Sequence, residues 1–253
     1  MKEKNEINKK LSEKPINISI KGIDARVIYQ IYRGHDLNTT LVSFGEKRRV
    51  LSTLDGLKKV FYIANTYNPY DLSIWTMANF MQYKRDFPLA MGISPRNISF
   101  LSTGVNMDDL ALCEKSYKNF QVSCIATAGA KGNALRTGVE VATHVEQPGS
   151  LVKVSGTINL LILTNSTLTD GAMARAIITA TEAKTAALQD LNVRSTAYPQ
   201  YQATGTGTDN VIVASGTVGE PLLLTSGHTK MGELIGCAVK EAVTEALHKF
   251  DGV

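Results

Sequence analysis

One eight-residue segment concentrates polar groups that could carry out chemistry. Residues 203–210 read Ala-Thr-Gly-Thr-Gly-Thr-Asp-Asn, so two glycines, three threonines, an aspartate and an asparagine stand together. Glycine lets the backbone approach another molecule closely, and the other side chains supply hydroxyl, carboxylate and amide groups. The apolar run Val211–Ala214 follows at once and predicts a buried strand. We interpret the segment as a functional loop at the start of that strand, although a plain turn uses the same residue types.

The glycines of this loop do not match a known nucleotide-binding motif. A dinucleotide fingerprint places its glycines between a strand and a helix, whereas these precede a strand. The Gly-Lys-Ser/Thr ending of a Walker loop and the Gly-x-Ser-x-Gly motif are both missing from the sequence. The segment instead offers candidate catalytic groups at Thr206, Thr208 and Asp209, and candidate substrate contacts at Gly205, Gly207 and Asn210.

A lysine lies in the apolar stripe of a helix predicted over residues 171–191. At about 100° per residue, Lys184 falls near the middle of the stripe and Glu182 points to the opposite side. An ammonium group in an apolar seam must be paired, reach water along its stem or lose its proton. We hypothesise that Lys184 faces the loop that carries Asp209, with Asp170 as the other candidate partner. A structural ion pair and a catalytic lysine both fit this position.

Three further polar positions are candidates. The Gly-rich segment Thr127–Ala134 is predicted to follow a strand, and offers backbone amides from Gly129 onward and the Asn133 side chain to a substrate carbonyl or oxyanion. Asn159 interrupts an apolar strand and needs hydrogen-bond partners. His228 precedes the last predicted helix, where it is either a cap or a proton carrier.

The composition is that of an ordinary globular protein. The chain has 253 residues, 43% hydrophobic and 20% charged, which is enough to bury a sizeable core. It has no apolar run of membrane-spanning length, and its aromatic residues do not interleave with basic patches, so we expect neither membrane nor nucleic-acid binding. Cys113, Cys124 and Cys237 are odd in number and lack metal-ligand spacing. We therefore expect a reduced, cytoplasmic protein without a metal site.

Strands and helices alternate along the chain and must position these residues. Residues 1–14 mix Lys and Glu with Asn and Ser, which predicts a disordered charged tail before a single domain over residues 15–253. The patterns predict strands over residues 16–32 (with a turn at Gly22), 40–43, 49–51, 60–64, 98–101, 122–126, 157–164 and 211–214. They predict helices over residues 72–87, 107–113, 171–191 and 229–250. The mixture indicates an α/β or α+β fold of layered helices and a mixed sheet, whose strand order the sequence does not determine.

Several segments together resemble one known family. They are Gly156–Leu160, Thr179–Ala187, Ala203–Asn210 and Gly227–Gly236, with Thr127–Gly138 in support. From about Phe100 to the C-terminus, the order and the residues of these segments resemble those of the adenosylcobinamide amidohydrolase family of corrinoid salvage. The residues within the matching motifs are Asn133, Asn159, Glu182, Lys184, Thr206, Thr208, Asp209 and His228.

The resemblance implies a reaction. The enzyme would hydrolyse the amide that joins the aminopropanol arm to the corrin ring of adenosylcobinamide, giving adenosylcobyric acid and 1-amino-2-propanol in cobamide (vitamin B12) salvage. No added cofactor is firmly implied, because the corrinoid substrate carries its own cobalt. The implied partner is this small molecule, and a homo-oligomer is left open.

Amide hydrolysis needs an activated nucleophile, a stabilised oxyanion and a protonated leaving amine. We assign water activation to Asp209 or Glu182 and amine protonation to Lys184 or His228, with Asn133 and the amides of residues 129–132 at the oxyanion.

Other readings stay open. In a rival scheme Thr206 or Thr208 is the nucleophile and Lys184 its base. Two other classes of function are a non-catalytic corrinoid carrier and an amidase for a different substrate. The corrin ring requires a wide, partly apolar pocket, for which Tyr198, Tyr201 and Trp75 are candidate lining residues.

Overall fold

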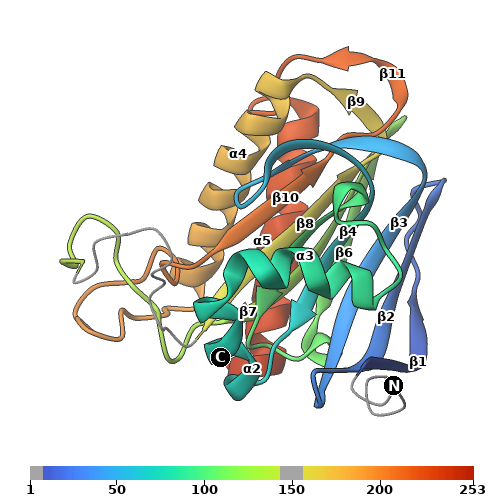
Figure 1. The fold of residues 1–253 in the computed structure, drawn as a ribbon. Coiled ribbons are helices and arrows are strands. Elements are labelled where there is room, and N and C mark those ends of the chain that lie inside the picture. The colour runs from blue at the N-terminus through green and yellow to red at the C-terminus, as the bar shows by residue number, and fades with distance from the viewer. Residues whose placement is uncertain (1–7, 143–155) are drawn as a thin grey trace.

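The strands of this computed structural model, which describes residues 8–142 and 156–253, form one curled mixed sheet of nine strands and a separate two-stranded pair (Figure 1). The main path of the large sheet is β1-β2-β3-β10-β8-β7-β6, and β4 pairs with both β3 and β5. The strands are β1 (Asn8–Ile16), β2 (Ile23–Tyr32), β3 (His35–Ser52), β4 (Gly56–Tyr67), β5 (Ile98–Thr103), β6 (Ala111–Tyr117), β7 (Phe120–Gly129), β8 (Thr157–Thr164), β9 (Ser166–Leu168), β10 (Asn210–Ala214) and β11 (Val218–Leu222). The helices are α2 (Tyr70–Ala78), α3 (Phe80–Ala90), α4 (Asp170–Asp190) and α5 (Lys230–Asp251), with the 3-10 turns η1 (Pro95–Asn97) and η2 (Met107–Asp109).

Strand β8 is buried on both faces, and this explains its nearly continuous apolar sequence. Its residues Ile158, Leu160 and Ile162 belong to the core cluster formed with α4 and α5. Leu161 and Leu163 face the other way, into a second cluster with residues of β3, β4 and β5. A third cluster lies between the N-terminal strands and α2 and α3, so helices cover the molecule on two sides (Figure 1). The expected layered fold with a mixed sheet is confirmed.

The N-terminal strands differ from the sequence prediction in length and extent. Residues 8–14, predicted as part of a disordered tail, form most of β1, which pairs antiparallel with β2. Residues 1–7 of the predicted tail lie outside the described part. The two short strands predicted at 40–43 and 49–51 are one strand, β3, with an irregularity between Ser43 and Arg48 in its pairing with β4. Cross-strand pairing supplies order that local composition does not indicate.

Two predicted helices are wrong in extent. The helix expected over residues 72–87 is two helices that meet at Asn79, whose backbone and side-chain nitrogens both donate to the Trp75 carbonyl, and Pro88 lies inside α3 instead of ending it. The helix expected over residues 107–113 is only the turn η2. Asn106 caps it as predicted, but the residues from Ala111 onward pair with β7 instead, because sheet formation overrides a weak local preference.

The C-terminal half follows the prediction closely. Strands β8 and β10 are where the apolar runs indicate, and they pair in parallel. Helix α4 begins after the N-cap Thr169, and α5 begins after Thr229 and ends at Gly252 in the left-handed conformation. None of the helices in the two described ranges combines the length and the apolar character that a membrane span requires.

Candidate functional site

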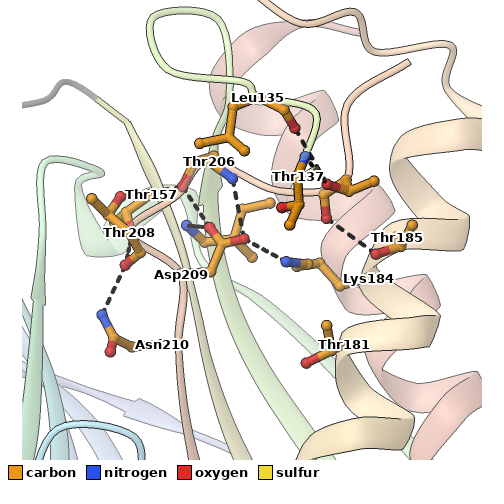
Figure 2. Close-up of polar contacts among 12 residues, drawn as sticks. Leu135, Thr137, Thr157, Thr181, Lys184, Thr185, Thr206, Thr208, Asp209 and Asn210 are labelled. Carbon is orange, nitrogen blue, oxygen red and sulfur yellow. Dashed lines mark hydrogen bonds and ion pairs between the residues drawn. The ribbon is translucent and has the colours of Figure 1, made fainter. Parts of the chain in front are cut away.

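Lys184 and Asp209 form an ion pair at one end of the molecule (Figure 2). Lys184 belongs to α4, and Asp209 immediately precedes β10. Lys184 Nζ lies 2.5 Å from Asp209 Oδ2. Both are largely buried, with side-chain exposures of 8% and 15%. The hypothesis that Lys184 faces this loop is confirmed. The other candidate partner, Asp170, pairs instead with Arg49 of β3.

The Asp209 carboxylate accepts hydrogen bonds at both oxygens. Oδ1 accepts from Thr206 Oγ1 at 2.5 Å and from the Ile158 amide at 3.0 Å. Oδ2 accepts from Lys184 and from the Thr206 amide at 3.2 Å. An ionised carboxylate has about four lone-pair sites, so these donors fill them. A water molecule could reach Asp209 only by displacing one of them.

The glycines of the loop are required by close contacts. A Cβ atom at Gly205 would lie 2.4 Å from Asp209 Oδ2 and 2.7 Å from Lys184 Nζ, too close for any real side chain. Gly207 has φ +76°, a conformation that L-residues rarely adopt. The loop is also fixed from outside, because Leu135 N donates to the Gly205 carbonyl and Thr204 N donates to the Leu135 carbonyl, both at 2.8 Å.

A chain of hydroxyls leads outward from Asp209. Thr206 is fully buried, whereas Thr208 is only partly buried, and their Oγ1 atoms lie 3.2 Å apart. Thr208 Oγ1 donates to the Gly156 carbonyl at 3.0 Å. Asn133 Nδ2 lies 3.5 Å from Thr208 Oγ1 and donates to the same Gly156 carbonyl at 3.2 Å. The predicted residues Asn133, Lys184, Thr206, Thr208 and Asp209 are therefore brought together.

Two predicted catalytic residues are not brought to this group. Glu182 is exposed, and at two residues from Lys184 it points to the other side of α4. His228 is also exposed, just before the N-cap of α5. The C-terminal end of α5 lies beside Ala130, in the loop that leads to Asn133. Helix α5 has 22 residues and is about 33 Å long, so His228 at its other end is far from Asn133.

Two predicted substrate contacts are already used within the protein. Asn159 is 1% exposed, and its Nδ2 donates to Asn65 Oδ1 at 2.8 Å and to the Ser102 carbonyl at 2.9 Å. Asn210 donates to the Thr208 carbonyl at 2.8 Å and accepts from Thr53 Oγ1 at 2.8 Å. Asn159 thus links β8 to β4 and β5, although its buried Oδ1 has no hydrogen-bond partner among the described residues, and Asn210 links its loop to the turn after β3.

The expected oxyanion amides are largely occupied. Ala130 N and Lys131 N donate to Asp251 Oδ2 at 2.6 and 3.3 Å, and the missing Cβ of Gly129 makes room for the Phe250 ring. Sequence reasoning missed Asp251. A signal was available, because an acidic residue in the last turn of a helix opposes the helix dipole and needs another partner. Asn133 is thus the remaining predicted oxyanion donor beside Thr208.

The candidate pocket residues differ in position. Tyr198 and Tyr201 are exposed on the connection between α4 and β10, the segment that ends at Asp209. Trp75 of α2 is partly buried, with the Arg33 guanidinium carbon 3.9 Å from its ring centroid. The two tyrosines remain candidates for lining a pocket. Within residues 8–142 and 156–253, no three His, Cys, Asp or Glu side chains form a group that could hold a metal ion.

Comparison with known proteins identifies the class of this site. A sequence model of the adenosylcobinamide amidohydrolase family matches residues 24–253, which is most of the chain and begins well before Phe100. The protein is a hydrolase that acts on an amide bond. The chain belongs to the adenosylcobinamide amidohydrolase family.

Two relatives and one solved structure are similar to the chain. An uncharacterized protein of Methanocaldococcus jannaschii is 45% identical over 229 residues, covering 86% of this chain and 89% of that protein. An adenosylcobinamide amidohydrolase of Methanosarcina mazei is 30% identical over 181 residues, covering 71% of this chain and 75% of that one. The crystal structure of the PH0078 protein from Pyrococcus horikoshii aligns with 84% of this chain and 77% of its own, at a TM-score of 0.43 and 14% identity.

Proposed function

We propose that this protein hydrolyses the amide between the aminopropanol arm and the corrin ring of adenosylcobinamide, releasing adenosylcobyric acid and 1-amino-2-propanol for cobamide salvage. Family membership supports a corrinoid amide as substrate. The three free cysteines fit a reducing compartment such as the cytoplasm.

The observation that carries the chemistry is the hydrogen-bonded chain Asp209–Thr206–Thr208, which ends at a partly exposed residue. Because the lone pairs of Asp209 are already occupied, direct activation of a water by its carboxylate would cost a hydrogen bond. Transfer through Thr206 keeps all four donors to Asp209 in place, since Thr206 passes its own proton to Asp209 while it accepts one from Thr208, whose hydroxyl turns from the Gly156 carbonyl toward Thr206. We therefore place the nucleophile at Thr208, as its hydroxyl or as a water bound to it.

The remaining tasks fall to groups beside this chain. Asn133 Nδ2, which lies near Thr208 Oγ1, would stabilise the oxyanion that forms when the amide carbonyl is attacked. Of the two acids considered for the leaving amine, Lys184 is within the group and His228 is not. In the net reaction water adds across the C–N bond, giving a carboxylate and an amine that takes up a proton.

The test is incubation with adenosylcobinamide and measurement of released 1-amino-2-propanol. We expect Asp209→Asn and Thr208→Val each to lower kcat by about 10²-fold or more, because each interrupts the proton path. Exposed Glu182→Gln is the matched control and should retain activity within about twofold, since a surface substitution away from the site has little effect.

The outcomes separate the alternatives. Accumulation of a covalent adduct on Thr208 would identify the hydroxyl as nucleophile, and turnover without one would favour the bound water. Tight binding of adenosylcobinamide with no release of amine would instead support a corrinoid carrier. Near-normal turnover in Asp209→Asn would remove Asp209 from the mechanism.

A further inference from the structure

A cavity lined mainly by polar residues lies at the other end of the parallel strands from Asp209. Its volume is about 250 Å³, and it is lined by Ser19, Lys21, Arg48, Gln121, Asn165, Thr217 and Val218. Asn165 follows the end of β8, whereas the Ile158 amide that binds Asp209 is near its start. With 8 residues at about 3.3 Å each, β8 separates the two sites by about 26 Å. The cavity is therefore distinct from the candidate active site.

Arg48 is the unusual member of this lining. It is only 6% exposed, and its Nε and Nη1 atoms are buried without a hydrogen-bond partner in the described chain. Its guanidinium carbon lies 5.1 Å from the centroid of the Phe44 ring, a cation–π contact that supplies no hydrogen-bond acceptor to Nε or Nη1. Burial lowers the pKa of Arg48, which reflects the cost of holding this charge out of water.

The acidic groups near the cavity do not neutralise Arg48. None of the seven lining residues is acidic, and Lys21 adds a second positive charge. Glu46 acts on Arg48 electrostatically, but it is exposed and forms no ion pair with it within the described residues. Glu114, next to the cavity, is already bound by Ser19 and Ser123. A buried, unpaired guanidinium is costly, so it calls for an anionic partner from outside the chain.

The walls of the cavity are held rigidly. The Asn165 carbonyl accepts from the amides of Thr217 and Val218, both at 3.0 Å. The Asn165 side chain accepts from Gln121 N at 2.9 Å. These bonds join the ends of β7, β8 and β11 and leave the side chains of Gln121 and Thr217 at the rim as hydrogen-bond donors.

We propose that this cavity binds a phosphate group, with Arg48 as its buried charged anchor, Lys21 as a second cation and Gln121 and Thr217 as neutral donors. Two cations match the charge of a phosphate better than the single charge of a carboxylate, and the guanidinium fork suits phosphate oxygens. Free inorganic phosphate and the phosphate group of an organic ester share this chemistry.

The test is titration of the purified full-length protein in phosphate-free buffer, followed by calorimetry and thermal unfolding. The probes are inorganic phosphate, glycerol 3-phosphate and acetate, at an ionic strength held constant with chloride. We expect saturable phosphate binding that raises the Tm of the wild type, since a ligand bound by the folded state stabilises it. Tighter binding of the ester would identify a phosphorylated organic ligand, and tighter binding of inorganic phosphate the free anion.

Variants at the cavity make the result specific. Arg48→Met should weaken phosphate binding more than tenfold, and its Tm without phosphate should equal or exceed that of the wild type because an unpaired buried charge is removed. Exposed Lys21→Gln, which carries no folding risk, should weaken binding by about two- to fivefold. Arg96→Gln, an exposed change of equal charge elsewhere, should bind like the wild type.

Three results would overturn the proposal. They are no saturable phosphate binding by the wild type, equal stabilisation by acetate, or wild-type binding in both Arg48→Met and Lys21→Gln. None of these readouts depends on amide hydrolysis, so they test phosphate binding independently of the proposed function.

Discussion

At the scale of single residues, the Lys184–Asp209 pair is the contact on which the site depends. Lys184→Met leaves Asp209 with three uncharged donors in a largely buried position. Removing one member of a buried pair costs about 3 kcal/mol, because the other charge is left uncompensated. We expect that loss in chemical denaturation and a fall in kcat of about 10²-fold or more. Full activity in this variant would refute a role for Lys184.

A control ion pair and a double variant distinguish an effect on stability from an effect on catalysis. Lys240 pairs with Asp190 at 2.5 Å, but both side chains are exposed, so Lys240→Met should cost less than about 1 kcal/mol. The double variant Lys184→Met, Asp209→Asn removes both charges and should recover stability relative to Lys184→Met. It should remain inactive. A double variant that regained turnover would show that the pair is only structural.

The residues of the site were partly predictable for a physical reason. A lysine in an apolar stripe must find a partner, and this requirement correctly indicated the Asp209 loop. Glu182 and His228 lie within the family-like motifs and carry suitable acid–base groups, but neither property says where a side chain lies. The Gly156 carbonyl and the Ile158 amide could not be predicted, since every residue offers such groups and only the fold selects them.

At the scale of elements, one carboxylate ties the turn between β3 and β4 to α3 and β5. Asp55 lies 2.8 Å from Lys84 Nζ and accepts from Ser99 Oγ at 2.6 Å. Burial by itself raises the pKa of Asp55, but the charge of Lys84 and the hydrogen bonds from Lys84 and Ser99 outweigh it. The pKa therefore lies below its ordinary value of 3.8.

The lowered pKa of Asp55 determines how its contribution to stability depends on pH. A depressed pKa contributes stability that is present above the ordinary value and is lost as the pH falls through the value in the folded state. Asp55→Asn should therefore lower the free energy of unfolding by about 1–3 kcal/mol at pH 7. The difference from the wild type should shrink below about pH 4. Denaturant titrations at pH 7, 4 and 3 measure this, with exposed Asp24→Asn as control; a difference that is constant with pH would contradict the assignment.

Elements were predictable where their own sequence decides them. Helix α5 has a sustained apolar stripe and a terminal glycine, and the structure agrees with both, although its N-cap is Thr229 and not the candidate His228. The joining of residues 35–52 into β3 depends on pairing with β2 and β4 along its length. Local preference is weak there, so tertiary pairing decides.

At the scale of the whole molecule, the site is assembled from segments that are far apart in the sequence. The loop after β7, the start of β8, α4 and the loop before β10 meet at one end (Figure 1). Strand β10 lies between β3 and β8 in the sheet, an order that no local pattern encodes. The contact between α4 and the loop before β10 was predicted from Lys184, but no sequence pattern predicts that the loop after β7 and the start of β8 meet them.

The C-terminal helix extends this assembly, because Asp251 holds the loop that leads to Asn133. Asp251 is 5% exposed and accepts from Ala130 N and Lys131 N. If Asp251 mattered only to its own helix, Asp251→Ala would stabilise the protein by about 0.3–1 kcal/mol, since an acidic residue opposes the dipole at this end.

Because Asp251 holds the loop, we expect the opposite sign. Asp251→Ala should lower stability by about 1–3 kcal/mol through the unpaired amides and lower kcat by about tenfold as Asn133 loses its position. Asp251→Asn keeps an acceptor oxygen and should recover most of both. Exposed Glu245→Ala on the same helix is the control and should change neither quantity appreciably. Thermal unfolding and amine release measured on the same preparations decide the matter: a stabilised, fully active Asp251→Ala variant would mean that this helix end does not position the site.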